Sequence, residues 1–584
     1  MPDEIKLRGY HNCDDVQLFW RTIVDNNLDI PIDGCLGFSI ERQRRNSAGD
    51  WGNSEILRNR VGFSNQPEDT GEGLPGSRSK PSNIWPFQRY DWTDHGANSG
   101  QIVRYRVVAL RPPNVGEVGT DPLEAIVASP WTDEISVNAD CGDGISAYFN
   151  RGTVMSQYVS RIARANNWSA IEIKENIREL EEPLRRFLSG ELRVELLRLL
   201  DEVIDNPELS FYAALYELED EELIGRLKLL RSRAHIVLAN GSVKNGDGNE
   251  DARNDLKGAN VDVYDRLLGS KGLGHNKFAI VVRKQPKTAL KVWTGSTNWA
   301  ATGLCTQINN GILIEDLAIA RHYLNQWDNL AAAGSEFPPA LVNANGQSPV
   351  GTANIDIWFT RLRKPPQNEP AADIVALKEL VNGAQEMILY VMFQPGGEPL
   401  ATILAKGNNS DVVVKGVVST VMGTTEEQFT LNGVDIESRE YRTALIQPEG
   451  IGMDFSAWVK EVTRYEFISM PNHPGIGHAI THSKMIVIDP FSDDCKVITG
   501  SHNFSKSASV GNDENFVVIT GNKSLAEAYA VACLATYTHY RWRAYVKEKT
   551  EADESIWDHL SPDPAWQNDC LSDAVKKTLS LWCR

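Results

Sequence analysis

Two short stretches, Gly274-His275-Asn276-Lys277 and Thr481-His482-Ser483-Lys484, carry the same spacing of histidine and lysine. Each opens an apolar run, over residues 278–282 in the first copy and 485–488 in the second. Apolar runs of this length are typical of buried strands. Because side chains two residues apart in a strand share one face, each histidine should lie beside its lysine. The sequence therefore predicts a duplicated strand with a polar pair at its start.

A second element repeats after each of these strands. Gly295-Ser296-Thr297-Asn298 follows the first and Gly500-Ser501-His502-Asn503 follows the second. Asn298 lies nine residues before Gln307, and Asn503 lies nine before Asn512, so the copies align without gaps. A Gly-Ser turn brings small polar groups close to the His–Lys face, and the asparagine adds an amide donor. Two such faces meeting across a pseudo-two-fold axis would surround one anion.

These residues resemble a known family. His482, Lys484 and Asp489, followed by Gly500-Ser501-His502-Asn503, match the HxKxxxxD and GSxN pattern of the phospholipase D superfamily. Glu514 fits the acidic element that follows in this family. The resemblance covers about residues 140–550. The first copy departs from the pattern, since Val282 stands in place of the aspartate and Asn309 in place of Glu514.

The resemblance implies a two-step displacement through a phosphohistidine, without a metal or cofactor. One histidine attacks phosphorus while the other protonates the leaving alcohol and later activates water or an acceptor alcohol. First-copy histidines often attack in the family, which favours His275, but the acidic support Glu514 belongs to the second copy, so both assignments stay open. The predicted catalytic residues are His275, Lys277, Asn298, His482, Lys484, Asn503 and Glu514, and the supporting residues are Ser296, Ser501 and Asp489.

The predicted fold class is α/β, with two pseudo-symmetric phospholipase D-like halves after a small all-β, sandwich-like domain. Alternating apolar residues at 103–109 indicate a half-buried strand near the N-terminus. From residue 355 a strand, helix, strand, helix, strand order is expected at 355–359, 371–382, 387–393, 399–405 and 412–418. The predicted domains are 1–139, 140–348 and 349–584.

The composition and the local sequence also bear on the partners of the protein, its location and its metal content. The chain has 584 residues and a formal net charge of −19, which counts modestly against nonspecific binding of nucleic acid. Its first residues lack the basic start and apolar stretch of a secretory signal, and no apolar run approaches the roughly 20 residues that span a bilayer, so a cytoplasmic location is expected. His473, His478 and His482 lie close together, but the surrounding prolines and glycines favour a loop at the edge of the pocket over a metal site.

Three functions remain compatible with the sequence. The first is hydrolysis or exchange of the headgroup of glycerophospholipids, with transient membrane contact. The second is a nuclease with the same chemistry, which is disfavoured by the acidic charge. The third is a noncatalytic protein that binds a phosphodiester through a partly degenerate first copy. Because both copies lie in one chain, oligomerisation is not required for a complete site.

Overall fold

The computed structural model divides the chain into two compact units. The first contains Met1–Asn138, Ser156–Ser169 and Tyr545–Arg584, and the second contains Ala139–Met155 and Ala170–Ala544. The predicted limit between the halves at 348/349 lies inside the second unit, and the three-domain division stays a prediction. The structure describes residues 3–67, 79–113, 118–152, 166, 172, 175–243, 246–350, 354–367, 369–418, 445–446, 481–551 and 559–584.

Two antiparallel sheets form the N-terminal part of the first unit. Strand β1 of one sheet contacts β9, β10 and β11 of the other, as expected for a β-sandwich. The predicted alternation holds in β9, where Val103, Tyr105 and Val107 are buried. The strands of the two sheets are β1 (Glu4–His11), β2 (Val16–Val24), β3 (Asn27–Leu28) and β8 (Asp91–Asp94), and β4 (Gly37–Arg44), β5 (Glu55–Ile56), β9 (Ile102–Arg111), β10 (Glu124–Ala128) and β11 (Ile135–Ser136); β6 (Arg58–Asn59) pairs separately with β7 (Lys80–Pro81).

The C-terminal residues complete this sandwich. Helix α17 (Asp573–Trp582) packs on β2, where the Trp582 ring stacks on Phe19 with centroids 4.5 Å apart. Helix α16 (Trp566–Cys570) contributes Trp566, whose indole N–H donates to the carbonyl of Cys35 at 3.1 Å. These buried rings belong to the hydrophobic interior of the first unit.

The second unit contains two large mixed sheets with the same topology. The first has the order β12-β18-β17-β16-β13-β14-β15, in which β13, β14 and β15 are parallel and the other neighbours are antiparallel. Its strands are β12 (Ile145–Phe149), β13 (Leu209–Leu215), β14 (Ala234–Ala239), β15 (Asp262–Arg266), β16 (Lys277–Arg283), β17 (Thr288–Gly295) and β18 (Asn310–Ile314).

The second sheet repeats this order from β20 to β23 and adds β19 at one edge. Its order is β19-β20-β26-β25-β24-β21-β22-β23, and β21, β22 and β23 are again parallel. Each strand of the first sheet thus has a counterpart, and β16 corresponds to β24. The strands are β19 (Gly346–Val350), β20 (Ile355–Phe359), β21 (Met387–Met392), β22 (Val413–Val418), β23 (Leu445–Ile446), β24 (Met485–Ile488), β25 (Lys496–Gly500) and β26 (Asn515–Thr520).

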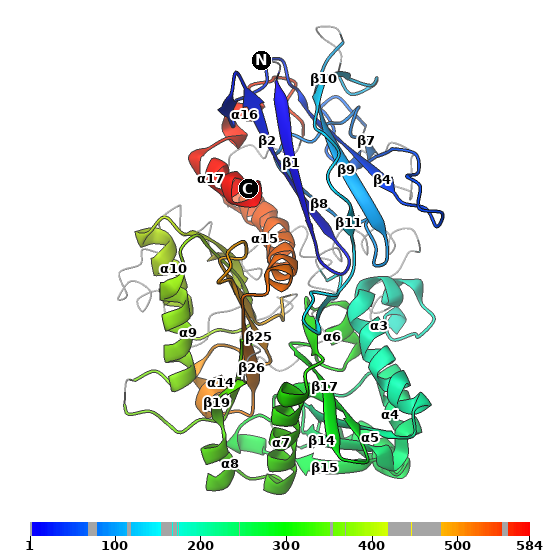
Figure 1. Cartoon of the computed structure of the whole chain (residues 1–584), viewed down its shortest axis with the longest axis vertical. Helices are drawn as coiled ribbons and strands as arrows, with labels where there is room; N and C mark the ends of the chain where they lie inside the picture. Colours follow the sequence, from blue (N-terminus) through cyan, green and yellow to red (C-terminus); the bar gives the residue numbers. More distant parts are fainter. Residues whose placement is uncertain are drawn as a thin grey trace. The chain divides into compact units, whose positions relative to one another are not determined.

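Helices cover both sheets, as Figure 1 shows for α4 and α5 beside the first and α9 and α10 beside the second. The strand and helix order predicted from residue 355 is confirmed, since α9 and α10 alternate with β20, β21 and β22. The predicted fold class is confirmed as well. The helices are α3 (Pro183–Asp205), α4 (Glu221–Leu230), α5 (Glu250–Gly258), α6 (Ala301–Cys305), α7 (Leu317–Ala333), α8 (Pro339–Ala344), α9 (Ala372–Gly383), α10 (Leu400–Asn409), α14 (Lys506–Val510) and α15 (Lys523–Glu551).

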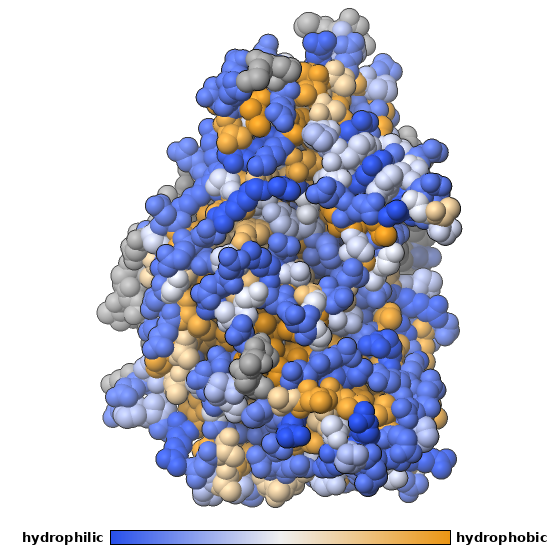
Figure 2. All heavy atoms as spheres, viewed as in Figure 1, coloured by the Kyte–Doolittle hydropathy of each residue, from blue (hydrophilic) through white to orange (hydrophobic). Residues whose placement is uncertain are grey.

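Hydrophilic residues cover most of the face in Figure 2, and hydrophobic residues form small areas between them. Among the described residues, no helix combines the length and apolar character needed to cross a membrane. The buried core of the second half contains side chains from one face of its sheet, including Ile388, Ile486 and Phe516, together with residues of α9 and α10. This packing holds β24 and its preceding polar residues in place.

Candidate active site

The two His–Lys pairs lie at the start of equivalent central strands. Residues Gly274 and Thr481, which precede the histidines, each form a parallel bridge with the opposite half, to Asp513 and Ile308 respectively. These bridges place each histidine beside a loop of the other half. His275 and His482 are each only 4% exposed. The structure therefore brings both predicted pairs to the junction between the two sheets.

Glu514 lies behind the histidine of the other half. Its Oε2 is 2.7 Å from Nδ1 of His275, and its Oε1 accepts a hydrogen bond from the Asn512 amide at 3.2 Å. Since an ionised carboxylate only accepts, Nδ1 of His275 carries the proton and Nε2 is left to react. Burial alone would raise the pKa of Glu514, but the adjacent His275 lowers it. Burial lowers the pKa of His275 to about 4, although Glu514 opposes this shift.

His482 has a neutral partner in the equivalent place. Its Nδ1 lies 2.9 Å from Oδ1 of Asn309. The Asn309 amide is oriented by two further bonds, since its Nδ2 donates to the carbonyl of Gly303 and its Oδ1 accepts from the Ser296 hydroxyl, both at 2.8 Å. Nδ1 of His482 therefore donates, and its Nε2 is left to react. Burial, followed by the charges of Lys484 and Lys277, places the pKa of His482 well below its usual value.

The two lysines occupy matching environments. Nζ of Lys277 donates to the carbonyl of His275 at 2.9 Å, and Lys484 donates in the same way to His482. Each ammonium group lies 4.8 Å from the centre of an aromatic ring, Tyr216 for Lys277 and Phe393 for Lys484. Burial lowers the pKa of both lysines, so a bound anion would stabilise their charged forms.

The predicted asparagines and serines lie around these groups. The Asn298 amide donates to Glu217, and the Oδ1 atoms of Asn298 and Asn503 have no hydrogen-bond partner among the described residues. The hydroxyls of Ser296 and Ser501 accept from the backbone N–H groups of Asn310 and Asn515, each at 3.0 Å. The serines thus fix the GSxN turns against β18 and β26.

Asp489 and His502 act on the structure around the site. Asp489 accepts the backbone N–H groups of residues 385, 386 and 387, each at 2.8 Å, and so fixes the start of β21. Nδ1 of His502 accepts the N–H of Phe504 at 3.0 Å, while its Nε2 lies 3.1 Å from Asp373. His502 is fully buried in this structural network.

Sequence reasoning missed three neighbours of the site, namely Tyr216, Glu217 and Phe393. The two aromatic rings contact His275 and His482, with centroids 4.5 Å and 4.7 Å apart. Glu217 accepts a hydrogen bond from Asn298 of the GSxN turn. Alignment of the two strands that precede these residues could have revealed the repeated aromatic positions.

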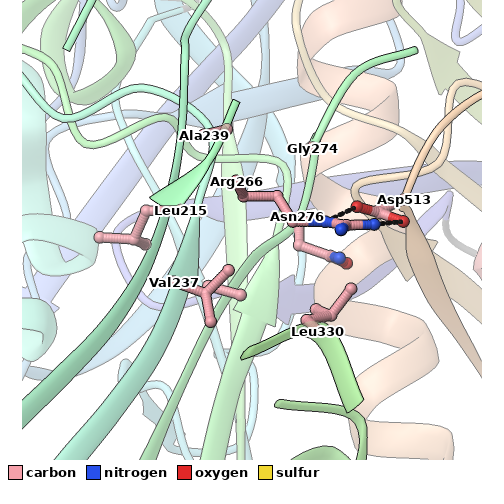
Figure 3. A pocket seen from close by; sticks show the side chains of 9 residues that line it. Leu215, Val237, Ala239, Arg266, Gly274, Asn276, Leu330 and Asp513 are labelled. Atoms are coloured by element: carbon pink, nitrogen blue, oxygen red, sulfur yellow. Dashed lines mark hydrogen bonds and ion pairs between the residues drawn. The ribbon is translucent and has the colours of Figure 1, made fainter. Parts of the chain in front are cut away.

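A buried ion pair between Arg266 and Asp513 connects the two halves next to the site. Nε of Arg266 lies 2.8 Å from Oδ2 of Asp513, and both side chains are 1% exposed. Figure 3 shows this pair at a small pocket beside Gly274 and Asn276. The pair joins the end of β15 to the residue before Glu514, so it maintains the contact between the halves.

Among the described residues, no group of three or more His, Cys, Asp or Glu side chains is placed to hold a metal; His473 and His478 lie outside the described residues.

Two topologically equivalent α/β halves that each present a histidine, a lysine and an asparagine at one junction define a two-motif site of the HxK type. Residues 377–532 match the family model described as cardiolipin synthase, PLD-like domain. A phospholipase D of Rickettsia felis is 31% identical over 134 residues, which are 22% of this chain and 61% of that relative. Part of the chain is therefore similar in sequence to phospholipase D-like domains.

The match spans less than two thirds of the length of that relative, and a phospholipase D of Rickettsia conorii matches to the same extent. The solved structures that match the chain include a phosphatidylserine synthase of Haemophilus influenzae, which is 11% identical with a TM-score of 0.38 and is aligned over 60% of this chain and 85% of its own. A phospholipase D family member from Salmonella typhimurium is 17% identical with a TM-score of 0.20, over 24% of this chain and 89% of its own.

Proposed function

We propose that this chain is a metal-independent phosphodiesterase that hydrolyses or transfers the headgroup of glycerophospholipids through a phosphohistidine. The observation that carries the proposal is the crossed support of the two histidines, whose Nδ1 atoms are both engaged by the opposite half. This arrangement leaves two Nε2 atoms for reaction and places two ammonium groups and two amides nearby. A phosphoryl group in such a site meets preorganised donors as its charge develops.

His275 is the nucleophile in this proposal. The carboxylate of Glu514 stabilises the positive charge that the ring of His275 acquires when it bonds to phosphorus. His482 is backed by the neutral Asn309, so its protonated form is a stronger acid and donates more readily to a leaving alkoxide. The difference between Glu514 and Asn309 therefore makes His275 the nucleophile and His482 the acid in this proposal.

The reaction proceeds in two balanced steps. The first step begins once the bound anion has favoured uptake of a solvent proton at Nε2 of His482. Nε2 of His275 then bonds to phosphorus, the bond from phosphorus to the leaving oxygen breaks, and that oxygen takes the proton from Nε2 of His482. In the second, water or an acceptor alcohol gives a proton to His482 and its oxygen bonds to phosphorus. The phosphorus–nitrogen bond then breaks and restores His275. Lys277 and Lys484 neutralise the nonbridging oxygens in both steps.

Phospholipid is the substrate class favoured by two further observations. Both curated relatives carry the name phospholipase D. The formal net charge of −19 is unfavourable for holding a long nucleic acid by its phosphates. Contact with the membrane is transient in this proposal, the protein acts in the cytoplasm, and no second copy is needed because both motifs lie in one chain.

Headgroup release from mixed phospholipid vesicles in excess chelator tests the proposal. The native protein and a His322→Ala control, altered on α7 away from the site, should release alcohol, whereas His482→Ala should not. Release by His482→Ala at the native rate would contradict the paired-histidine chemistry. Cleavage of single-stranded DNA without lipid turnover would identify a nuclease instead, and phosphate binding without any turnover would identify a noncatalytic binding protein.

A further inference from the structure

Glu217 is a carboxylate within the site that the family pattern does not assign. It lies two residues after the end of β13, and its Oε2 accepts a hydrogen bond from Nδ2 of Asn298 at 2.5 Å. The hydroxyl of Ser242 is a second hydrogen-bond partner of this carboxylate. The backbone carbonyl of Glu217 also accepts the N–H of Trp299 at 3.1 Å. Side chain and backbone therefore both tie Glu217 to the GSxN turn.

The second half has an uncharged residue in the equivalent place. Leu215 pairs with Lys277 across β13 and β16, and Val391 pairs with Met485 across β21 and β24. This register makes Gln394 the counterpart of Glu217. Gln394 has the same length and shape as a glutamate but carries no charge. The chain thus supplies its own comparison for what the carboxylate adds.

The charge of Glu217 acts on both lysines of the site. Burial lowers the pKa of Lys277 and Lys484, and the carboxylates of Glu514 and Glu217 oppose this shift for each of them. Burial also raises the pKa of Glu217, an effect that Lys277 and Lys484 reduce and the nearby Glu219 increases. With two histidines neutral, the two carboxylates balance the two ammonium groups before an anion binds.

We propose that Glu217 is a positioning residue, which orients the Asn298 amide so that its second N–H faces a phosphoryl oxygen. Its negative charge also keeps Lys277 and Lys484 in their ammonium forms, in which they bind that oxygen. The inference rests on the proposed phosphodiesterase function for its effect on rate. Its effect on anion binding is independent of turnover.

Two substitutions separate the charge from the hydrogen bond. Glu217→Gln keeps an acceptor for Asn298 and reproduces the residue of the second half, but it removes the charge. Glu217→Asp keeps the charge, but its shorter side chain moves away from Asn298. Glu221→Gln, which changes an exposed glutamate at the start of α4, is the matched control.

Calorimetric titration with inorganic phosphate between about pH 6 and 9 measures the charge effect. The pH above which binding is lost should fall by about one unit in Glu217→Gln, which makes binding about tenfold weaker at the alkaline end. At the acid end, Glu217→Gln should bind as tightly as the native protein or more tightly, because one repulsive charge is gone. Glu217→Asp and Glu221→Gln should keep the native pH profile.

Turnover of a phosphodiester at the optimum pH measures the positioning effect. Glu217→Asp should lose about tenfold or more in kcat, because Asn298 is no longer oriented, whereas Glu217→Gln should retain kcat within a few-fold. Equal weakening of phosphate binding at every pH in Glu217→Gln would overturn the charge effect. Native kcat in Glu217→Asp would overturn the positioning effect.

Gln394→Glu keeps the test decisive if Glu217→Gln does not fold, since the added carboxylate should move the alkaline loss of binding to higher pH. An unchanged profile in Gln394→Glu would then contradict the inference. A native protein that binds phosphate but turns over no diester would refute the proposed function alone. The phosphate titrations would still decide the role of the Glu217 charge.

Discussion

The substitution Glu514→Gln should greatly slow the first chemical step, in which His275 attacks phosphorus. Oε2 of Glu514 lies 2.7 Å from Nδ1 of His275, which places the carboxylate charge about 4 Å from the ring that becomes positive. At an effective dielectric constant of about 20, this attraction amounts to about 4 kcal/mol. Since each 1.4 kcal/mol is about tenfold in rate, the loss should be roughly a thousandfold.

A rapid acid-quench experiment with bis(4-nitrophenyl) phosphate isolates this step, because nitrophenolate leaves without help from an acid. Asn309→Asp is the matched comparison, since it puts a carboxylate behind His482 instead. It should leave the nitrophenolate burst nearly unchanged and slow only diesters with poor leaving alcohols. A loss below about tenfold in Glu514→Gln, with native thermal stability, would refute the assignment of Glu514 as the electrostatic partner of the nucleophile.

Other predictions concern pH and stability. Because the pKa of His275 is lowered to about 4, this ring stays neutral in mild acid, and kcat/KM for bis(4-nitrophenyl) phosphate should persist below pH 6.5 and fall only near pH 4. Asp489→Ala should lower the free energy of unfolding in urea by about 2–4 kcal/mol, because three backbone N–H groups lose their acceptor; an unchanged midpoint would contradict this role. Breaking the Arg266–Asp513 pair by Arg266→Met should cost about 3–5 kcal/mol, and adding Asp513→Leu should recover much of it; additive losses in the double variant would contradict coupling.

The two equivalent strands at the candidate site could be predicted from local sequence. Apolar runs after His275 and His482 predict strands, and the equal spacing to Asn298 and Asn503 predicts equivalent turns. The structure places these strands as β16, which includes Lys277, and β24, which follows Lys484. Duplication made the prediction strong, because two copies of one polar pattern require two copies of its local fold.

The crossed contacts did not follow from local sequence. Glu514 follows the second motif but supports His275 of the first, and a sequence gives no distance between segments of different halves. Glu217 was missed for a related reason, since the acidic run after it resembles a helix start. That interpretation is correct for Asp220, whose carboxylate caps α4. Glu217, by contrast, lies near the end of the preceding strand, at the candidate site.

The partners of the C-terminal helices were also beyond local prediction. Trp582 stacks on Phe19, and Trp582 accepts a hydrogen bond from Tyr10 through its backbone carbonyl at 2.7 Å, across a separation of 572 residues. The apolar face of a short helix indicates that it packs against something, but not which sheet it covers. Such contacts depend on the folded surfaces of the first unit.

Trapping of the covalent intermediate tests the central claim most directly. In His482→Ala, bis(4-nitrophenyl) phosphate should still phosphorylate the protein, because its leaving group needs no acid, but hydrolysis should stall without the base. Mass spectrometry of the protein denatured and digested at alkaline pH, where the phosphorus–nitrogen bond survives, should then place one 4-nitrophenyl phosphoryl group on the peptide that contains His275, and none in His275→Ala. An adduct on His482 in the His275→Ala protein, or no adduct in a protein that releases nitrophenolate, would contradict the account.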